Sequence, residues 1–414
     1  MLAISSFRAL WFGQICSQLA ANTLLFVLAL AVYQATGKNT AVSALFLSYG
    51  VPAVLFGLIA GTAVDHLDKR RVLIYCDLVR AILTASLVFI SGNIFLVYGI
   101  TFVNAVITQL YVPSEAPTIP RLAPPHLIVP ANSLFSFTFY TSLAVGSVLA
   151  GPLLRLAGSQ GVFLIISFFF GVAAWNESRL PSQAAGTLGF TAILRHKVAD
   201  IVRRVFSELM DGLRYVAQRR VLSDSLLLLT GTQIILVMLG TLGPGFADRV
   251  LEVDFRDASL LIVGPAVLGI IVGAIWVGMV GFKFKTERLI RVGILGAGIM
   301  LLLISLTVRL HRVPEVSWLF GDSVRLPLVF TLFFLLGVAN SFLDVPANSV
   351  LQEEAKGSMR GRVYGILTAA VGGVGVLPVL VGGILADVVG VGKVVFALGF
   401  LVLSYGVWRM KYNR

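Results

Sequence analysis

Long apolar stretches alternate with short polar breaks along almost the whole chain. The breaks contain charged residues, prolines and glycines, and between them the pattern predicts six spans, near residues 9–33, 41–64, 72–91, 94–112, 131–155 and 159–176. Six more are predicted near residues 222–246, 258–281, 289–308, 327–346, 363–386 and 393–410. Because a helix needs about 20 mostly apolar residues to cross a bilayer, we predict an all-α integral membrane protein. Its twelve transmembrane helices are numbered here as spans 1 to 12.

The longest polar stretch, residues 177–221, separates the two sets of six spans. Apolar residues recur there at helical spacing, opposite three arginines. The apolar residues are Ile201, Val205, Leu209, Leu213 and Val216, and the arginines are Arg203, Arg204 and Arg214. This pattern predicts an amphipathic helix on an anionic membrane surface. We therefore expect an N-terminal six-helix bundle (1–176), a cytoplasmic linker (177–221) and a C-terminal six-helix bundle (222–414). The linker either couples the bundles or only connects them, and we favour the second reading.

Composition excludes a water-soluble globule, because 57% of the residues are hydrophobic and only 13% are charged, about half of the usual charged share. Lys and Arg total 32 against 20 Asp and Glu, a net charge of +12. Assigning alternate loops to one side places 24 of the 32 basic residues together. Loops rich in Lys and Arg stay cytoplasmic. The charge therefore predicts a multi-pass protein of the cytoplasmic membrane with both termini in the cytoplasm, and not a nucleic-acid partner.

Few residue patterns favour an enzyme. Cys16 and Cys76 lie inside apolar segments, and the four histidines are scattered without ligand spacing, so we expect no disulfide framework and no metal site. We find no phosphate-binding glycine loop for ATP, no catalytic triad and no cofactor loop. The first apolar run is too long and too polar for a cleaved signal peptide. The first helix is thus expected to remain, and no cofactor is expected.

The two sets of spans repeat weakly. Residues 110–113 (LYVP) in span 4 match residues 343–346 (LDVP) in span 10, and VGSVLAGPLL from Val145 in span 5 matches VGGVGVLPVL from Val371 in span 11. The matches fall in the same order on corresponding helices. Such internal duplication is typical of secondary transporters.

Three amides follow one face of span 1 at intervals of four residues: Gln14, Gln18 and Asn22. Amides facing lipid would be costly, so this face should point into the bundle. Either the amides bind substrate or they form hydrogen bonds between helices, and the sequence leaves both open. On the corresponding span 7, Gln233 is a weaker candidate for the opposite wall.

Spans 4 and 10 carry the other polar faces. Span 4 has Asn104, Thr108, Tyr111 and Glu115 on one face, and span 10 has Asn340 and Asp344 one turn apart. An ionisable group at membrane depth is a candidate functional residue. Glu115 follows Pro113, so we favour a solvated carboxylate at a loop edge for it. Asp344 precedes Pro346 and should lie within the membrane.

The loop after span 2 reads GTAVDHLDKRR over residues 61–71, and Asp77 and Arg80 follow in span 3. It resembles the loop signature G-x-x-x-D-(R/K)-x-G-R-(R/K)-(R/K) of the major facilitator superfamily. The matching positions are Gly61, Asp65, Arg70 and Arg71, whereas His66, Asp68 and Lys69 depart from the common pattern. The loop after span 8, GFKFKTER, lacks the aspartate.

Two further stretches are similar to one branch of that superfamily. Gly146, Gly151 and Pro152 in span 5 resemble the G-x4-G-P motif of its antiporters. PRLAPPHLIVPANSL from Pro120 and the residues 361–363, which include Arg362, resemble the macrolide- and enterobactin-exporter branch. Small residues allow close helix approach, so we expect helix packing there and in span 11, at Gly372, Gly373, Gly375 and Pro378.

The resemblance implies alternating access by two bundles around a cavity lined by spans 1, 4, 7 and 10. Asp65 would then face the start of span 11 and close a cytoplasmic gate, gaining about 0.3–1 kcal/mol from the helix N-terminus. Arg362 precedes that helix. Charge pairs among Arg70, Arg71, Asp77 and Arg80 would change during the cycle. The alternative is that these charges only anchor the topology.

We therefore expect a proton-coupled exporter of small amphipathic molecules such as drugs, macrolides or siderophores, working as a monomer among membrane lipids. A lipid or lysophospholipid transporter is the alternative within this class, and a membrane sensor or scaffold is the alternative outside it. The candidate substrate-binding residues are Gln14, Gln18, Asn22, Asn104, Thr108, Tyr111, Gln233 and Asn340. Asp344 is the first candidate for the coupling proton and Glu115 is the second.

Overall fold

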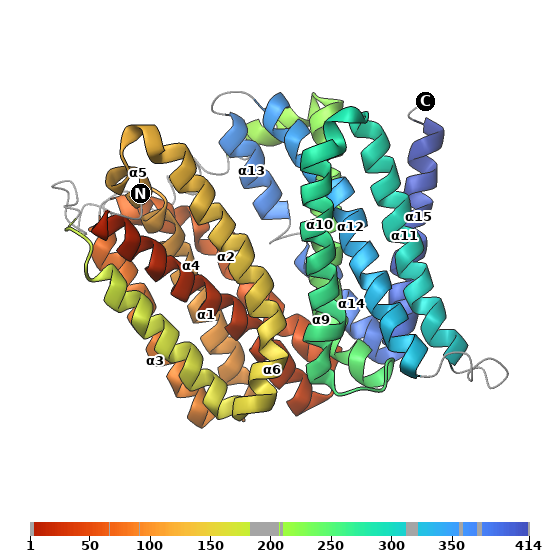
Figure 1. Cartoon of the computed structure of the whole chain (residues 1–414), viewed down its shortest axis with the longest axis horizontal. Helices are drawn as coiled ribbons and strands as arrows, with labels where there is room; N and C mark the ends of the chain where they lie inside the picture. Colours follow the sequence, from red (N-terminus) through yellow and green to blue (C-terminus); the bar gives the residue numbers. More distant parts are fainter. Residues whose placement is uncertain are drawn as a thin grey trace. The chain divides into compact units, whose positions relative to one another are not determined.

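A computed structural model describes residues 4–65, 67–90, 92–182, 207, 210–311, 322–355, 359–370 and 375–412. The regular elements of these residues are all helical (Figure 1). Ten helices of the described chain are long and apolar enough to cross a membrane. The all-α membrane class is therefore confirmed. Most of the predicted linker helix, including Ile201, Val205 and Leu209, lies outside the described residues.

The chain separates into two compact units. Unit 1 comprises Met1–Ala35 and Ala44–Ser207, and unit 2 comprises Thr36–Ser43 and Glu208–Arg414. The described helices that begin in the first half of the chain are α1 (Ser5–Thr36), α2 (Asn39–Asp65), α3 (Lys69–Ile90), α4 (Ile94–Glu115), α5 (Thr118–Leu122), η1 (Pro125–Leu127) and α6 (Ile128–Glu177).

Helix α6 contains predicted spans 5 and 6 in one element. Gly158, at φ 65°, interrupts its helical backbone. Glycine adopts this left-handed conformation without the steric cost of a Cβ atom. The two spans are thus joined by a kink and not by a loop.

Unit 2 contains the remaining helices. They are α9 (Arg220–Arg249), η2 (Phe255–Asp257), η3 (Ser259–Val263), α10 (Gly264–Val280), η4 (Gly281–Lys283), α11 (Thr286–His311), α12 (Asp322–Glu354), α13 (Met359–Ala369), α14 (Val376–Val389) and α15 (Val391–Tyr412). Predicted span 11 falls on α13 and α14, which flank the undescribed residues 371–374. Predicted span 10 was placed too short, because α12 continues through Pro346 to Glu354. Proline is tolerated in transmembrane helices where neighbouring groups satisfy the freed carbonyl.

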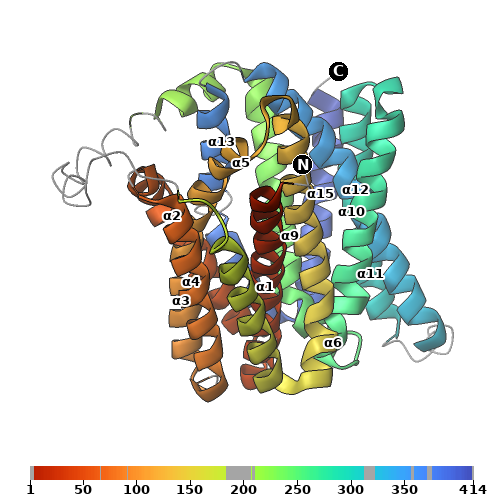
Figure 2. The same ribbon diagram turned by 60° about the vertical axis from the view of Figure 1, so that its left-hand side comes forward.

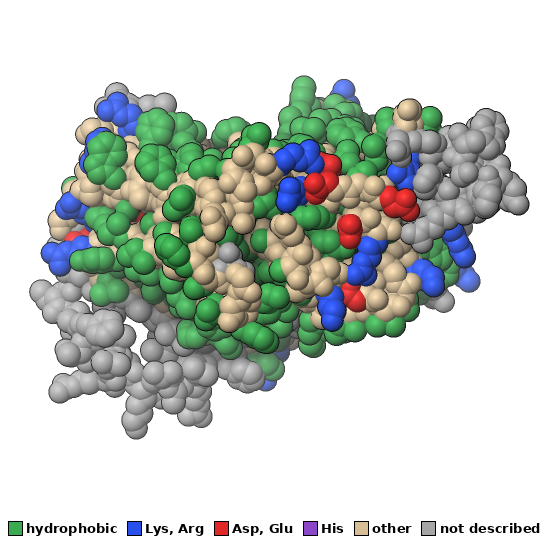
Figure 3. Space-filling view, turned by 90° about the horizontal axis from the view of Figure 1, so that it is seen from below, with side chains coloured by type: hydrophobic (Ala, Val, Ile, Leu, Met, Phe, Trp, Pro, Cys, Tyr) green, Lys and Arg blue, Asp and Glu red, His purple; other side chains and the backbone are tan. Residues whose placement is uncertain are grey.

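Each unit has its own apolar core. In unit 1, the rings of Phe7 and Phe135 meet edge to face with centroids 5.8 Å apart. In unit 2, Phe246 of α9 and Phe333 of α12 meet in the same way at 5.8 Å. Large apolar side chains also cover the outside, and the view from below shows hydrophobic side chains over much of the described surface (Figure 3). A soluble protein rarely exposes such a surface, whereas lipid solvates it.

Glycines bring helix backbones close together. Helix α12 packs against both α10 and α11 (Figures 1 and 2). A Cβ atom at Gly269 of α10 would collide with the carbonyl oxygen of Phe334, and one at Gly337 of α12 would collide with that of Ala266. In unit 1, a Cβ atom at Gly146 of α6 would lie 2.9 Å from the amide nitrogen of Thr23 in α1. Small residues at these positions permit the close packing that membrane helices favour.

Candidate functional site

A buried ion pair lies on α3 in unit 1. Arg80 Nη1 lies 3.1 Å from Asp77 Oδ1, and the two residues are 3% and 0% exposed. Ser17 of α1 donates a hydrogen bond of 2.9 Å to the same oxygen of Asp77, and Arg80 donates one of 2.9 Å to Thr108 of α4. The pair therefore ties α3 to α1 and α4, deep within the bundle.

The four predicted gating charges have different partners in this structure. Asp77 and Arg80 pair with each other, while Arg71 lies 3.8 Å from Asp68 at the start of α3. Arg70 donates to the carbonyl oxygen of Ser178. Asp77 and Arg80 thus form one pair, two to three turns along α3 from the loop, while Arg70 and Arg71 contact other residues. Gly61 and Asp65 end α2, and the side chains of Asp65 and Arg362 lie outside the described residues.

Two more acids are buried beside this pair. Tyr111 of α4 donates a hydrogen bond of 2.9 Å to Oε1 of Glu177, which is 0% exposed. The guanidinium of Arg80 lies over the Tyr111 ring, 4.8 Å from its centroid, a favourable cation–π arrangement. Glu115 is only 7% exposed, so the expected loop-edge carboxylate was wrong. We call Asp77, Arg80, Tyr111, Glu115 and Glu177 the acid cluster.

Several polar atoms at the cluster lack partners among the described residues. They are Asp77 Oδ2, Asn104 Oδ1 and Nδ2, Glu115 Oε1 and Glu177 Oε2. Buried polar groups normally form hydrogen bonds. Asn104 and Thr108 also line a cavity of about 20 Å³, which is the size of a water molecule. The predicted substrate residues of α4 therefore adjoin a water-sized space in this structure.

The amide stripe of α1 divides in two. Gln14 is buried, and its side chain donates a hydrogen bond of 3.4 Å to the carbonyl oxygen of Phe135 in α6. That contact fits helix packing better than substrate binding. Gln18 and Asn22 are partly exposed, and the Cβ atom of Asn22 lies beside Gly146. These two are the partly exposed amides of the stripe, and the Nδ2 atom of Asn22 is buried without a partner among the described residues.

In unit 2, Asp344 of α12 accepts hydrogen bonds from the side chains of Gln233 on α9 and Asn348 on α12. It is partly exposed. The structure thus brings together two candidate residues that the sequence placed on different helices, Gln233 on span 7 and Asp344 on span 10. Asn340, one turn before Asp344, is buried and lines a cavity.

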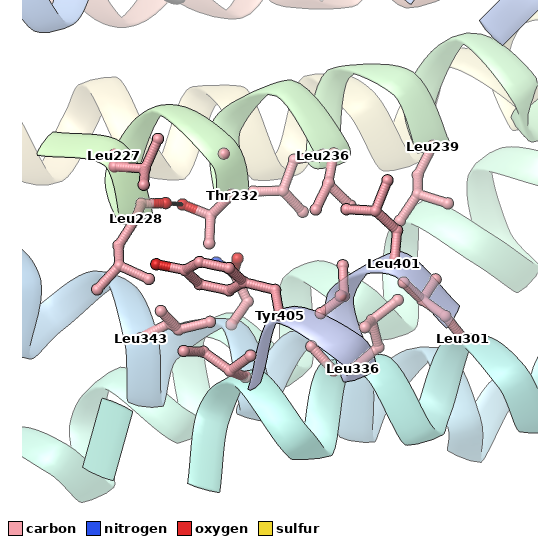
Figure 4. Close-up of a pocket in the computed structure, with 16 residues that line it drawn as sticks. Leu227, Leu228, Thr232, Leu236, Leu239, Leu301, Leu336, Leu343, Leu401 and Tyr405 are labelled. Carbon is pink, nitrogen blue, oxygen red and sulfur yellow. Dashed lines mark hydrogen bonds between the residues drawn. The ribbon is translucent and has the colours of Figure 1, made fainter. Parts of the chain in front are cut away.

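That cavity has a volume of about 280 Å³ and lies among α9, α11, α12 and α15 (Figure 4). Its lining extends along α9 from Leu227 to Leu239, a rise of about 18 Å for a helix. Tyr405 lies near Leu228 and Thr232, while Leu239 lies toward the other end (Figure 4). The lining residues are Leu227, Leu228, Gly231, Thr232, Ile235, Leu236, Leu239, Ile294, Ala297, Leu301, Leu336, Asn340, Leu343, Leu401, Val402 and Tyr405. Thr232, Asn340 and Tyr405 are the polar members, so the cavity is mostly apolar.

A second charged site was missed from the sequence. Asp387, near the end of α14, accepts hydrogen bonds from the amide and side chain of Asn39, at 2.9 and 3.0 Å, and from those of Thr40, at 2.8 and 2.7 Å. Arg249 of α9 lies 3.6 Å from the same carboxylate and also donates to the carbonyl of Gly37. Asp387 therefore caps the first turn of α2. Predicted span 11 stopped one residue earlier, and Asn39-Thr40 at a helix start was the available signal.

The predicted packing residues have different environments. Gly146 and Gly151 are buried, and Pro152 is partly buried. Pro378, the third residue of α14, is exposed, which does not support close packing at this proline. Gly372 and Gly373 lie outside the described residues.

Comparisons with known proteins identify the class. The family profile of the Major Facilitator Superfamily matches residues 10–377, and the chain belongs to this family. It is 24% identical to the multidrug efflux pump Tap of Mycolicibacterium fortuitum over 391 residues, covering 91% of this chain and 88% of that one. It is 21% identical to macrolide efflux protein A of Streptococcus pyogenes, covering 97% and 94%.

A solved structure agrees in fold. The POT family transporter PepTSo superposes with a TM-score of 0.73 at 14% identity, covering 99% of this chain and 98% of that one. The resemblance to the superfamily inferred from the loop at residues 61–71 is thus confirmed. The chain is a multi-pass membrane transporter, and such transporters move small solutes across membranes.

Proposed function

We propose that this transporter exports small amphipathic molecules across the cytoplasmic membrane by alternating access, using the proton gradient. The observation that carries the proposal is the cavity of about 280 Å³ in unit 2. Its long apolar wall suits a hydrophobic body, and Asn340 and Tyr405 offer hydrogen bonds to a polar group. Ligand sites commonly combine an apolar lining with a few polar groups that fix orientation.

The two efflux relatives support the direction of transport. Their names describe multidrug and macrolide efflux, and macrolides carry both apolar and polar surface. The excess of Lys and Arg on one set of loops supports cytoplasmic termini.

A lipid substrate is the second candidate. The lining of the cavity extends for about 18 Å along α9, which is long enough for an extended acyl chain. A lysophospholipid would place its tail along Leu236 and Leu239 and its polar part near Tyr405.

Transport into proteoliposomes with an imposed pH gradient tests the function. The panel should contain a macrolide, an amphipathic dye and a lysophospholipid. We expect gradient-driven movement of at least one of them, and we expect Leu236→Trp, which fills the cavity, to reduce it more than tenfold. Leu227→Trp at the exposed end of the lining is the matched control. Absence of movement for every solute, or equal activity of both tryptophan variants, contradicts the proposal.

Asp344 and Glu115 are our candidates for coupling, since each is a carboxyl group on a membrane-spanning helix, α12 or α4. Gln233 and Asn348 donate to Asp344 without neutralising it, so a proton can bind there. Asp344→Asn should abolish uphill export driven by a pH gradient but retain downhill exchange. Intact gradient-driven export in both Asp344→Asn and Glu115→Gln would exclude both residues.

A further inference from the structure

The acid cluster of unit 1 buries more acids than bases. Asp77, Glu115 and Glu177 are 0%, 7% and 0% exposed. Arg80 pairs with Asp77 and also acts electrostatically on both glutamates. With every group ionised, three carboxylates and one guanidinium carry a net charge of −2. Uncompensated charge in an apolar bundle is strongly unfavourable. The cluster therefore needs two further positive charges to be stable as it stands.

We propose that Glu115 and Glu177 form a proton-binding site that holds two protons in this conformation, while Asp77 remains ionised beside Arg80. The contacts decide which acid keeps its charge. Asp77 receives hydrogen bonds from Arg80 at 3.1 Å and Ser17 at 2.9 Å. Glu177 receives one, from Tyr111, and its Oε2 has no partner among the described residues.

Glu115 is still less supported as an anion. Its Oε1 is buried without a partner within the described part of the chain. An ionised carboxylate requires several donors, whereas a neutral carboxyl group requires fewer. Protonation thus matches the number of donors that the bundle supplies to each acid.

Besides Glu177 itself, the titratable groups at the acid cluster come from four helices. They are Cys76, Asp77 and Arg80 of α3, Tyr111 and Glu115 of α4, Cys16 of α1, and Tyr49 of α2, with Arg70 bound to the carbonyl of the next residue, Ser178. Tyr111 and Glu115 are one turn apart and share a face of α4. Tyr111 also contacts both Glu177 and Arg80. It therefore connects Glu177 to the Asp77–Arg80 pair and lies one turn before Glu115.

A proton leaving either glutamate passes to water and leaves a carboxylate behind. Hydration of the cluster, or movement of Arg80 toward the new anion, would then stabilise the charge. Assigning these two protons to the transport cycle rests on the proposed function, whereas the site itself rests only on the cluster. The site belongs to unit 1, whereas Asp344 belongs to unit 2.

Infrared titration of the purified protein in liposomes tests the site directly. The wild type should show the C=O band of protonated carboxyl groups at neutral pH and lose it at alkaline pH. Glu115→Gln and Glu177→Gln should each remove about half of that band, and the double variant should remove it. Glu353→Gln, at an exposed position of α12, is the matched control and should leave the band unchanged.

Several results would overturn the proposal. Absence of the C=O band from the wild type at neutral pH would refute the site, however the variants fold. A full C=O band in the double variant would also refute it. Glutamine resembles the neutral carboxyl group in shape, so thermal unfolding of the variants should match the wild type near neutral pH.

The same preparation separates this proposal from the proposed function. A wild type that shows the band but moves no solute refutes export and leaves the site intact. A wild type that exports solute but lacks the band refutes the site alone. If both hold, the double variant should lose gradient-driven export and keep downhill exchange.

Discussion

Removing the carboxylate of Asp387 should destabilise the first turn of α2. The first amides of a helix have no partner within the helix, and Asp387 accepts the hydrogen bonds of Asn39 and Thr40 at 2.9 and 2.8 Å. Loss of such a cap costs about 0.5–2 kcal/mol, and loss of its charge at the helix end adds about 0.3–1 kcal/mol. The Asp387 side chain is only 17% exposed, so solvent screens little of this interaction.

Hydrogen–deuterium exchange of the segment around Asn39 and Thr40 measures the effect. Taking about 2 kcal/mol for Asp387→Ala, the two amides should exchange about 30-fold faster. Thr40→Val removes only the hydroxyl bond of 2.7 Å and should accelerate exchange a few-fold, since one hydrogen bond contributes about 0.5–1.5 kcal/mol. Peptides from α10 should not change. Unchanged exchange at Asn39 and Thr40 in Asp387→Ala would refute the capping role.

Three further predictions concern other parts of the molecule. Gly146→Leu should impair transport, because the leucine side chain would collide with the backbone of α1. Gly171→Leu on the same helix α6 meets open space and should be tolerated. Equal uptake rates of the two variants in proteoliposomes would contradict this prediction. Gln18→Ala and Asn22→Ala should alter apparent substrate affinity several-fold in binding measurements, with little change in membrane abundance on immunoblots. Reduced abundance with unchanged affinity would show that both amides serve helix packing and not substrate binding. Asp65→Asn should insert normally but lose most transport, and cysteine labelling should shift toward the inward-open state; wild-type labelling and transport would remove the gate assignment.

The transmembrane helices were predictable because bilayer thickness imposes a length on each apolar run. The predicted spans fall on described helices, and the family resemblance followed from a loop of eleven residues, 61–71. The apolar runs of the sequence did not show where a helix continues beyond its apolar part. Helix α4 extends through Pro113 to Glu115, and α12 extends through Pro346 to Glu354.

The candidate site was predicted less completely, because spacing fixes the face of a residue on its own helix but not the neighbour that covers it. Tyr111 and Asp77 were identified, yet Glu177 was missed since it stands one residue beyond the apolar run of span 6. Its partner Tyr111 is 66 residues away in the chain. Glu115 was misplaced for the same reason: the helices that bury it are distant in sequence.

The ion pair within α3 has a consequence for how the protein is made. A single charged side chain at the centre of a helix costs about 2.5–3.5 kcal/mol on membrane insertion, so α3 would be a poor substrate for the translocon if its two charges acted separately. Asp77 and Arg80 are three residues apart on one face and can pair within the isolated helix. The part of α3 that follows Lys69, Arg70 and Arg71 can thus enter the bilayer without net charge before α4 and α6 have been synthesised.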